Sequence, residues 1–451
     1  MFITKILLGL IGLGVVVFVH ELGHFFAARL VGIDVEAFSI GWGKPLLKKK
    51  FRGVEYRLGM FPLGGYCKMR GENEFQEAWE NRRREISPTP GTFFGANPFR
   101  RILVAFAGPL FNLLFAVLVL SVIWGAGFEV NTLGNRIILA SELGLPDQSY
   151  PADEAGLETG DRIISINGVD TPYYHDIQEN IAVNPEKNLA LKVERDGTIL
   201  DLTVRPSLEK STGAGKIGVY FWTEPVLSET AGPARAAGLL PGDRILRVNG
   251  EELPYTVKML PLLEQAPQSL TLDYERDGRK ASTVLIPVYQ EGGGIDLGLS
   301  YGAVTYKNPS LLPPAALAKG ARETWKTLVV SLRSLSLLFR GIDLTQAVSG
   351  PVRISYMAGD IAAEAFGQGI GTGFRSMANF LSLISIALCV MNLLPLPVLD
   401  GGMILLFVVE AVQRKPLHPR AVSAFQTVGV VLIFGLMIFA IFGDILYLVR
   451  H

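Results

Sequence analysis

Four apolar segments constrain this chain more than any other feature of its sequence. They cover residues 6–31, 102–128, 377–396 and 428–449, and each contains few charged side chains. A helix rises about 1.5 Å per residue, so roughly 20 apolar residues cross the hydrocarbon core of a bilayer. Hydrophobic residues make up 49% of the chain, and its mean hydropathy is +0.33. The sequence therefore predicts a multi-pass α-helical membrane protein with four transmembrane helices.

The distribution of Lys and Arg predicts how these helices are oriented. Residues 33–101 contain thirteen Lys and Arg, and a second basic group follows the third segment, at Arg414, Lys415 and Arg420. Basic loops stay in the cytoplasm, so the first helix runs inward and the second returns. We expect residues 129–375, which have soluble composition, to be extracytoplasmic.

The first apolar segment contains the sequence His20-Glu21-Leu22-Gly23-His24. Residues four apart share a helix face, so both imidazoles can bind one metal ion while Glu21 reaches a water bound to it. Three other interpretations compete: a chance match, a signal peptide, and two histidines satisfied in a core. The apolar run is long and lacks a clear cleavage pattern, and two of only five histidines flank a glutamate. These features favour a metal site.

A third metal ligand is expected at the end of the third apolar segment. Asp400 is the only acidic residue between positions 374 and 407. A helix cap or an interfacial charge would also explain an aspartate there. However, segments one and three both run inward and carry their acidic residues near the inner end, so Asp400 should lie at the depth of the histidines. Tetrahedral zinc would then have three protein ligands and one water.

Residues 61–69 are apolar yet rich in glycine, and they follow two expected short strands, 46–51 and 54–60. Two interpretations explain this stretch equally well. One is a plain surface hairpin. The other is a sheet edge that approaches the metal site, where Gly64 and Gly65 permit close contact of the backbone.

The second apolar segment contains Gly108-Pro109-Leu110-Phe111-Asn112. Gly108 and Asn112 are four apart and share a helix face. A small residue beside an amide suits close helix packing with an interhelical hydrogen bond. We therefore expect Gly108 and Asn112 to serve helix packing.

The extracytoplasmic region contains an internal repeat. Residues 151–168 align without gaps to residues 233–250, and eleven of the eighteen positions are identical. Each copy continues with a helix-like stretch and with strands around an Asp-Gly turn, at Asp196-Gly197 and Asp277-Gly278. The copies are two small β-rich modules, and their repeated Gly-Asp-Arg-Ile and Asn-Gly sequences resemble PDZ domains of the bacterial protease type.

These features predict two PDZ-like domains inserted between helices 2 and 3. The expected parts are a first membrane half with the cytoplasmic hairpin (1–128), two PDZ-like domains (129–214 and 215–302), an amphipathic extracytoplasmic segment (303–375) and a second membrane half (376–451). In the amphipathic segment, residues 313–340 have the spacing of a helix with one apolar face.

Charge and cysteine content exclude two further classes of protein. The 42 basic residues balance 42 acidic ones, so the chain is not expected to bind nucleic acid. It has only two cysteines, Cys67 and Cys389, which is too few for a disulfide framework.

Taken together, the sequence resembles the site-2 protease family of intramembrane zinc metalloproteases, and within it the bacterial regulator-of-sigma-E protease group with tandem PDZ domains. The resemblance extends over nearly the whole chain, from His20 through the glycine-rich stretch, both modules and Ser349-Gly350-Pro351 to the segment 392–402. It implies that His20, His24 and Asp400 bind zinc and that Glu21 is the catalytic acid and base.

The resemblance also implies the substrate and its location. Asn392 would help to hold the substrate, and Gly64, Gly65 and Tyr66 would pair with it as an added strand. The substrates would be membrane proteins with a single transmembrane helix, such as anti-sigma-factor-like regulators or remnant signal peptides. The protein would lie in the bacterial inner membrane, with the active site toward the cytoplasm and the PDZ domains in the periplasm.

The role of the modules is open between two alternatives. They could bind peptides by strand addition, as PDZ domains do, or they could act as a size filter over the active site. The absence of a Gly-Leu-Gly-Phe carboxylate loop favours the filter. One rival function is a membrane-anchored tandem PDZ scaffold without activity, which does not account for Glu21 or Asp400. The other is a metal transporter that uses these residues as an ion path, which two soluble modules and one compact site make less natural.

Overall fold

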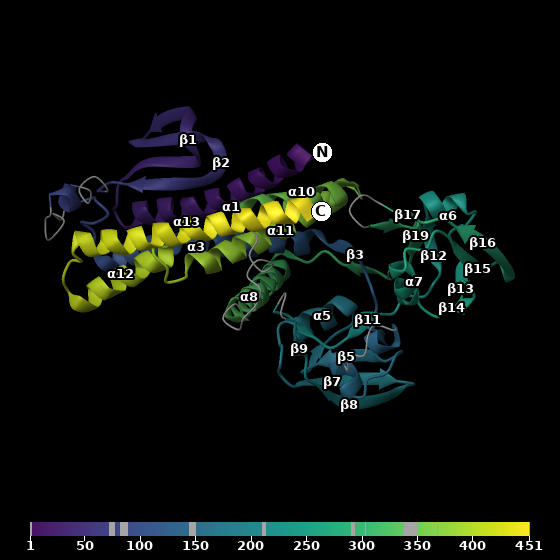
Figure 1. Ribbon diagram of the computed structural model, residues 1–451. Helices are drawn as coiled ribbons and strands as arrows, with labels where there is room; N and C mark the ends of the chain where they lie inside the picture. Colours follow the sequence, from purple (N-terminus) through teal and green to yellow (C-terminus); the bar gives the residue numbers. More distant parts are fainter. Residues whose placement is uncertain are drawn as a thin grey trace. The chain divides into compact units, whose positions relative to one another are not determined.

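The computed structural model describes residues 2–71, 77–81, 89–143, 150–209, 213–289, 294–302, 304–337, 350–367 and 369–450. The chain divides into two compact units. One consists mainly of residues 1–128, 309–336 and 344–449, and the other mainly of residues 129–308. The first unit is helical apart from one β-ribbon, and the second is rich in strands (Figure 1).

Four helices of the described chain are long and apolar enough to cross a membrane, as expected from the sequence. They are α1 (Phe2–Leu30), α3 (Pro98–Ala126), α11 (Ile370–Asn392) and α13 (Pro419–Arg450). The third apolar segment was expected to continue to residue 396, but α11 ends at Asn392. The cause is local, because Pro395 and Pro397 follow and disfavour helix in the residues before them.

Shorter helices complete the first unit. They are α8 (Pro313–Leu337), α10 (Pro351–Gly367) and α12 (Asp400–Gln413). The helix α8 matches the expected amphipathic one. Helix α10 packs against α1 and α11. Its buried small residues, Ala358 and Ala362, explain the close packing. Both α8 and α10 lie in the helical unit, although the sequence predicted a separate extracytoplasmic segment 303–375.

The β-ribbon consists of β1 (Val35–Phe51) and β2 (Val54–Met69), joined at Arg52-Gly53. Both strands are much longer than the expected strands 46–51 and 54–60, and both bend. Residues 55–58 pair with 47–50 on one side and with 37–40 on the other, and residues 65–69 also pair with the 35–40 stretch. The ribbon therefore forms a four-stranded sheet in which residues 65–69 form one edge; residues 37–40 and 55–58 pair in parallel register, and the two outer pairings are antiparallel.

The two repeats fold into modules with the same strand order. It is β6-β5-β7-β8 in the first and β14-β13-β15-β16 in the second. The strands of the first sheet are β5 (Arg162–Ile166), β6 (Val169–Asp170), β7 (Leu189–Arg195) and β8 (Thr198–Val204). Those of the second are β13 (Arg244–Val248), β14 (Glu251–Glu252), β15 (Leu270–Arg276) and β16 (Arg279–Leu285).

The helices beside these sheets differ between the copies. The first module has α4 (Pro151–Glu154) and α5 (Tyr174–Ala182), whereas the second has α6 (Gly232–Ala236), the 3₁₀ turn η2 (Thr256–Met259) and α7 (Leu260–Glu264). Pro261 stands in the first turn of α7, where it ends the preceding turn and leaves a shorter helix than α5.

Short strand pairs close each module. In the first module, β4 pairs with β11 and β9 pairs with β10, and the 3₁₀ turn η1 (Ala140–Leu143) follows β4. In the second module, β12 pairs with β19 and β17 pairs with β18. Their bounds are β4 (Ile137–Leu139), β9 (Ser207–Leu208), β10 (Gly215–Lys216), β11 (Val219–Phe221), β12 (Leu227–Thr230), β17 (Val288–Tyr289), β18 (Ile295–Asp296) and β19 (Leu299–Tyr301). Ile217 is buried in the hydrophobic core of the first module, together with Ile163 and Leu191. The first module therefore extends past the expected boundary at residue 214.

The repeated Gly-Asp-Arg sequence has a structural role. Asp161 accepts hydrogen bonds from Arg195 in the first module, and Asp243 accepts them from Arg276 in the second. Each aspartate also caps a turn, at the backbone N–H of Glu158 or Leu240. The paired charge thus holds the same loop against the same strand in both copies.

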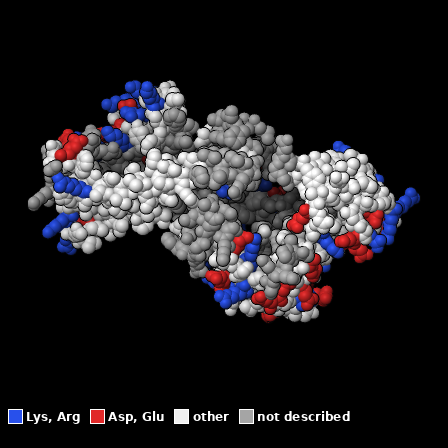
Figure 2. Space-filling view, in the orientation of Figure 1, with Lys and Arg blue, Asp and Glu red and all other residues white. Residues whose placement is uncertain are grey.

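The modules are joined to the rest of the chain by a strand pair, β3 (Phe128–Thr132) with β20 (Val304–Asn308). The chain therefore enters and leaves this region side by side. Charged side chains are abundant on the modules and on the β1–β2 ribbon, whereas the visible helix surface beside the ribbon is mostly uncharged (Figure 2). This distribution fits helices that face lipid.

Candidate metal centre

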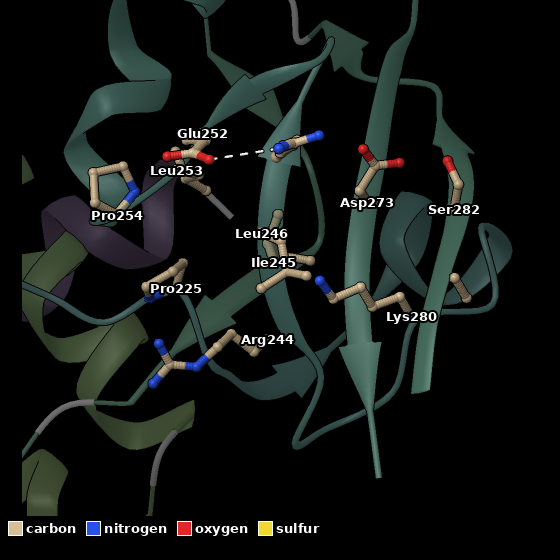
Figure 3. A pocket seen from close by; sticks show the side chains of 12 residues that line it. Pro225, Arg244, Ile245, Leu246, Glu252, Leu253, Pro254, Asp273, Lys280 and Ser282 are labelled. Carbon is tan, nitrogen blue, oxygen red and sulfur yellow. Dashed lines mark hydrogen bonds and ion pairs between the residues drawn. The ribbon is translucent and has the colours of Figure 1, made fainter. Parts of the chain in front are cut away.

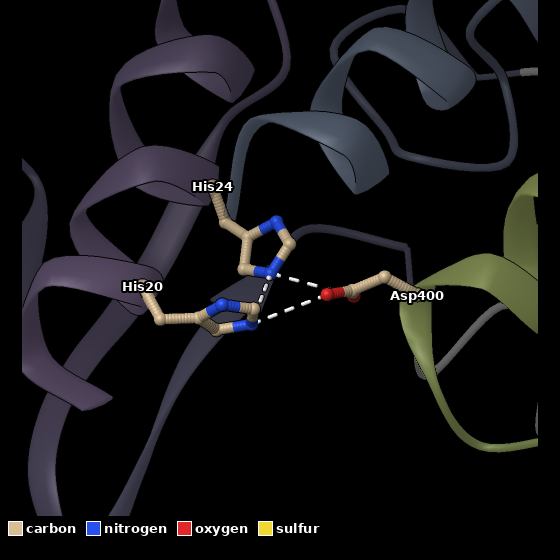
Figure 4. Close-up of side chains that lie close together, drawn as sticks. All are labelled: His20, His24 and Asp400. Atoms are coloured by element: carbon tan, nitrogen blue, oxygen red, sulfur yellow. Dashed lines mark hydrogen bonds and ion pairs between the residues drawn. The ribbon is translucent and has the colours of Figure 1, made fainter. Parts of the chain in front are cut away.

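One turn of α1 brings His20 and His24 together. Their Nε2 atoms lie 3.1 Å apart, and both side chains are buried (Figure 4). Two ring nitrogens at this distance cannot both carry a proton, because the protons would collide. Such a contact is typical of two nitrogens that share one cation.

Asp400 reaches the same point from the other end of the chain. It is the first residue of α12, and the preceding Leu399 is extended, with φ −82° and ψ 160°. One carboxylate oxygen lies 3.2 Å from His20 Nε2, and the other lies 3.4 Å from His24 Nε2. A pair of residues one turn apart thus meets a carboxylate almost 400 positions away.

The spacing of these three ligands fits zinc. A tetrahedral edge is about 1.63 times the metal–ligand bond, so bonds of about 2.0–2.1 Å give ligand separations of about 3.3 Å. The two Nε2 atoms are 3.1 Å apart, and each lies 3.2 or 3.4 Å from a different oxygen of Asp400, so every contact is close to that value. In addition, Asp400 Oδ2 is buried and has no hydrogen-bond partner among the described residues, which is costly for a carboxylate unless a cation binds it.

The second nitrogen of His24 is held by backbone. His24 Nδ1 lies 2.8 Å from the carbonyl oxygen of Val104 on α3 and donates its proton to it. This bond leaves the Nε2 lone pair directed at the cluster, an arrangement that supports metal-bound histidines. The sequence carried no signal for it, because the acceptor is a main-chain atom that any residue supplies.

Gly108 makes room for both rings. A Cβ atom at this position would lie 2.4 Å from His24 Nε2 and 2.7 Å from His20 Cε1. Helices α1 and α3 also cross closely at this point, since a Cβ on Gly23 would lie 2.3 Å from the Ala107 oxygen. Gly108 therefore contacts the site itself as well as lying at the helix crossing.

The cluster opens into a cavity of about 450 Å³. Glu21 lines it, and its carboxylate accepts a hydrogen bond from the backbone N–H of Cys67. Most of the other residues expected from the sequence also line it, together with side chains that the sequence did not point to. The expected ones are Gly64, Gly65, Tyr66 and Asn392, and the unexpected ones include Trp42, Phe93 and Met403.

The edge of the ribbon sheet faces this cavity. Residues 65–69 pair with β1 on one side, and the Cys67 N–H on their open side binds Glu21. Gly65 allows the approach, because a Cβ there would lie 3.2 Å from Glu21 Cγ. The Tyr66 hydroxyl, by contrast, accepts a hydrogen bond from Arg57. The surface-hairpin interpretation therefore does not describe this stretch, which lies against the candidate site.

Hollows also occur on the modules. In the second module, a concavity of about 660 Å³ is lined by residues of β13, β15 and β16 (Figure 3). Arg247 and Glu252, which form an ion pair, are among its lining residues. In the first, a groove of about 1330 Å³ lies between α5 and the stretch 215–221. Neither contains a residue of the metal cluster.

The family model described as peptidase family M50 matches residues 8–436. The chain belongs to peptidase family M50. A relative from Treponema pallidum named as a zinc metalloprotease is 37% identical over 98% of this chain and 99% of its own length. The regulator of sigma E protease of Haemophilus influenzae is 32% identical over 97% and 98%, and that of Salmonella typhimurium is 30% identical over 96% and 97%.

This M50 peptidase is a zinc metalloprotease, and its apolar helices are those of an intramembrane enzyme. The bacterial relatives and the four helices are consistent with an inner-membrane protein. Among solved structures, a PDZ domain of EpsC from Vibrio cholerae matches 25% of the chain and 92% of that domain, with 22% identity and a TM-score of 0.11. The fold of the modules therefore rests on their own repeated strand order.

Proposed function

We propose that this M50 peptidase cleaves the transmembrane segment of single-span membrane proteins, with zinc held by His20, His24 and Asp400. The observation that supports this most is the meeting of those three side chains with Glu21 in one cavity bordered by an open strand edge. Anti-sigma-factor-like regulators and remnant signal peptides are the substrate classes that suit such a site.

Glu21 acts as the general acid and base. Zinc at the cluster would supply a Lewis acid and lower the pKa of a water beside it. The Glu21 carboxylate takes the proton of the attacking water and later passes it to the leaving nitrogen of the peptide bond. The Cys67 N–H, which binds this carboxylate, keeps it directed into the cavity.

The substrate is held by replacing its lost helical hydrogen bonds. A transmembrane helix must unwind before a protease can reach its carbonyl groups, and each unpaired backbone group is costly in lipid. The open side of residues 64–69 offers a strand partner, and Asn392 offers an amide at the cavity wall. Gly65 lets this strand lie close to Glu21, and Gly64 lets the Trp42 indole pack against the same strand.

Replacing Glu21 tests this function. The Glu21→Gln variant should stay folded and keep near-stoichiometric zinc, because this side chain is not a ligand. Cleavage of a single-span reporter in detergent should fall by roughly 10²–10⁴-fold. Glu36→Gln is the matched control: it removes an exposed carboxylate that does not line the cavity, and it should leave turnover unchanged. Turnover near the parental rate in Glu21→Gln would remove Glu21 from the mechanism.

The PDZ-like modules act as a size filter outside the membrane, while the active site opens toward the cytoplasm. The Lys and Arg distribution supports this orientation, and the paired strands β3 and β20 support a tethered domain pair that can be removed as one piece. Joining residue 132 to residue 304 by a short turn should permit cleavage of substrates that keep large outer domains. Trimmed substrates should still be cut.

A point variant gives the same test without a deletion. Ile245 is fully buried in the second core, so Ile245→Asp should loosen that module, whereas Val284→Asp on an exposed position should not. The rival is a receptor role, which the groove beside α5 favours because it has the form of a strand-addition site. If the folded, zinc-loaded deletion variant cuts no trimmed substrate, the receptor role replaces the filter.

A further inference from the structure

His20 is supported differently from His24. Its Nε2 atom takes part in the metal cluster, while its Nδ1 atom has two amide groups within reach. The Nδ2 atom of Asn112 lies 3.4 Å from His20 Nδ1, and that of Asn392 lies 3.5 Å from it. Neither residue is near the other in sequence, since Asn112 belongs to α3 and Asn392 ends α11.

The position of the proton on the His20 ring determines whether an amide oxygen or an amide nitrogen can form a hydrogen bond with Nδ1. A neutral imidazole whose Nε2 binds a metal must carry its proton on Nδ1, so Nδ1 becomes a donor. An amide nitrogen is a donor too and cannot accept this proton. Meanwhile, Asn112 Oδ1 is buried without a hydrogen-bond partner among the described residues, and Asn112 as a whole is 0% exposed. Among the described residues, the Nδ1–H of His20 therefore lacks an acceptor and the neighbouring Oδ1 of Asn112 lacks a donor.

A half-turn of the Asn112 amide satisfies both groups. It exchanges Oδ1 with Nδ2 while hardly changing the shape of the side chain, and it places Oδ1 against His20 Nδ1–H. We propose that Asn112 is a positioning residue of the metal centre, whose side-chain oxygen accepts the His20 Nδ1 proton and so directs the Nε2 lone pair to zinc. It plays for His20 the part that the Val104 carbonyl plays for His24.

Burial separates the roles of the two asparagines. Asn392 is half-buried and lines the cavity, where it can turn toward a substrate. Asn112 does not line the cavity. Its main-chain carbonyl oxygen accepts a hydrogen bond of 2.9 Å from Ser385 Oγ on α11. Its backbone thus serves helix packing, and its side chain is left for His20.

Zinc affinity tests this proposal, which rests on the proposed zinc site. The full-length protein in detergent is stripped of metal and titrated with zinc against a chelator. Asn112→Leu has the same shape but no acceptor and should bind zinc 10–100-fold more weakly. Asn112→Asp restores an acceptor and should stay within a few-fold of the parent. Ser385→Ala, the matched control, removes the packing bond and should lower the melting temperature of the metal-free protein without changing zinc affinity.

A pure packing role gives the opposite order. Asn112→Leu would then bind zinc like the parent, and Asn112→Asp would unfold because it buries a charge; this result, or unfolding of both variants, overturns the proposal. Failure of the zinc site itself is distinguished by His20→Ala. If that variant binds zinc as tightly as the parent, the ligand assignment is wrong, whatever the Asn112 variants show.

Discussion

Gly108 lies directly against the ring of His24, although the two residues belong to different helices and 84 positions separate them. The space for a Cβ atom at Gly108 is already occupied, with His24 Nε2 2.4 Å away. The same helix supplies the Val104 carbonyl that holds the other nitrogen of this ring. Helix α3 therefore orients the candidate ligands of α1, and its smallest residue determines how closely it can approach.

Gly108→Ala should disrupt the metal centre, because the added methyl group displaces one or both imidazoles. We expect folded protein with weakened zinc binding and strongly reduced cleavage. Gly125→Ala on the same helix is the matched control, since its Cβ would meet only ordinary contacts, the nearest at 3.7 Å. Normal zinc affinity in Gly108→Ala would show that the rings can move aside.

Asp400→Ala should leave only two protein ligands for zinc. The purified variant should contain far less than stoichiometric metal by elemental analysis and should not cleave substrate. Asp400→Asn, which keeps the shape and one oxygen, should retain some metal with lower affinity. If Asp400→Ala holds zinc as tightly as the parent, a different residue is the third ligand.

Accessibility of thiols tests the orientation. Cys67 and Cys389 are not joined by a disulfide in the described structure, and Cys67 is only half-exposed, so exposed reporter positions are preferable. In a Cys67→Ala, Cys389→Ala background, an impermeant reagent added to spheroplasts should label Thr198→Cys in the first module. It should label Lys49→Cys on the ribbon only after lysis. The reverse pattern would overturn the proposed topology.

The Asp243–Arg276 pair makes the stability of the second module depend on pH. Burial of the Asp243 carboxylate raises its pKa, but the bonds from Arg276 and the Leu240 N–H more than offset this, so its pKa lies below the ordinary value. A lowered folded pKa stabilises the fold above the unfolded pKa of about 3.9, and this stabilisation is lost as pH falls through the folded pKa.

Asp243→Asn should therefore lower the free energy of unfolding at neutral pH by about 1–3 kcal/mol. The difference from the parent should shrink as pH falls below about 4 and continue to shrink until the pH passes the lowered folded pKa of Asp243, where its carboxyl is protonated and uncharged like the amide of the variant. Thermal unfolding of the full-length protein in detergent measures it, with Asp277→Asn in an exposed turn as the control. An equal difference at pH 7 and pH 3 would exclude the ion pair as its cause.

Much of this protein can be predicted from local patterns in its sequence. The spans follow from apolar length, the histidine pair from helical spacing, and the modules from identical residues at matching positions. The strands of the β1–β2 ribbon are longer than predicted. Residues 37–40 and 55–58 each pair with two other segments, one on either side. Pairing of that kind depends on where the chain bends, and no periodicity in residues 35–69 records it.

The four membrane segments, the doubled module and the residue types of the candidate site can be predicted from the amino-acid sequence, because each depends on chemistry within a few neighbouring positions. Three relationships become visible only in the folded chain: Gly108 and Asn112 lie against the histidines, the Val104 carbonyl holds His24, and the edge of the ribbon faces Glu21. Those relationships join residues tens to hundreds of positions apart. They arise from the distance and angle at which helices pack, which no single segment specifies.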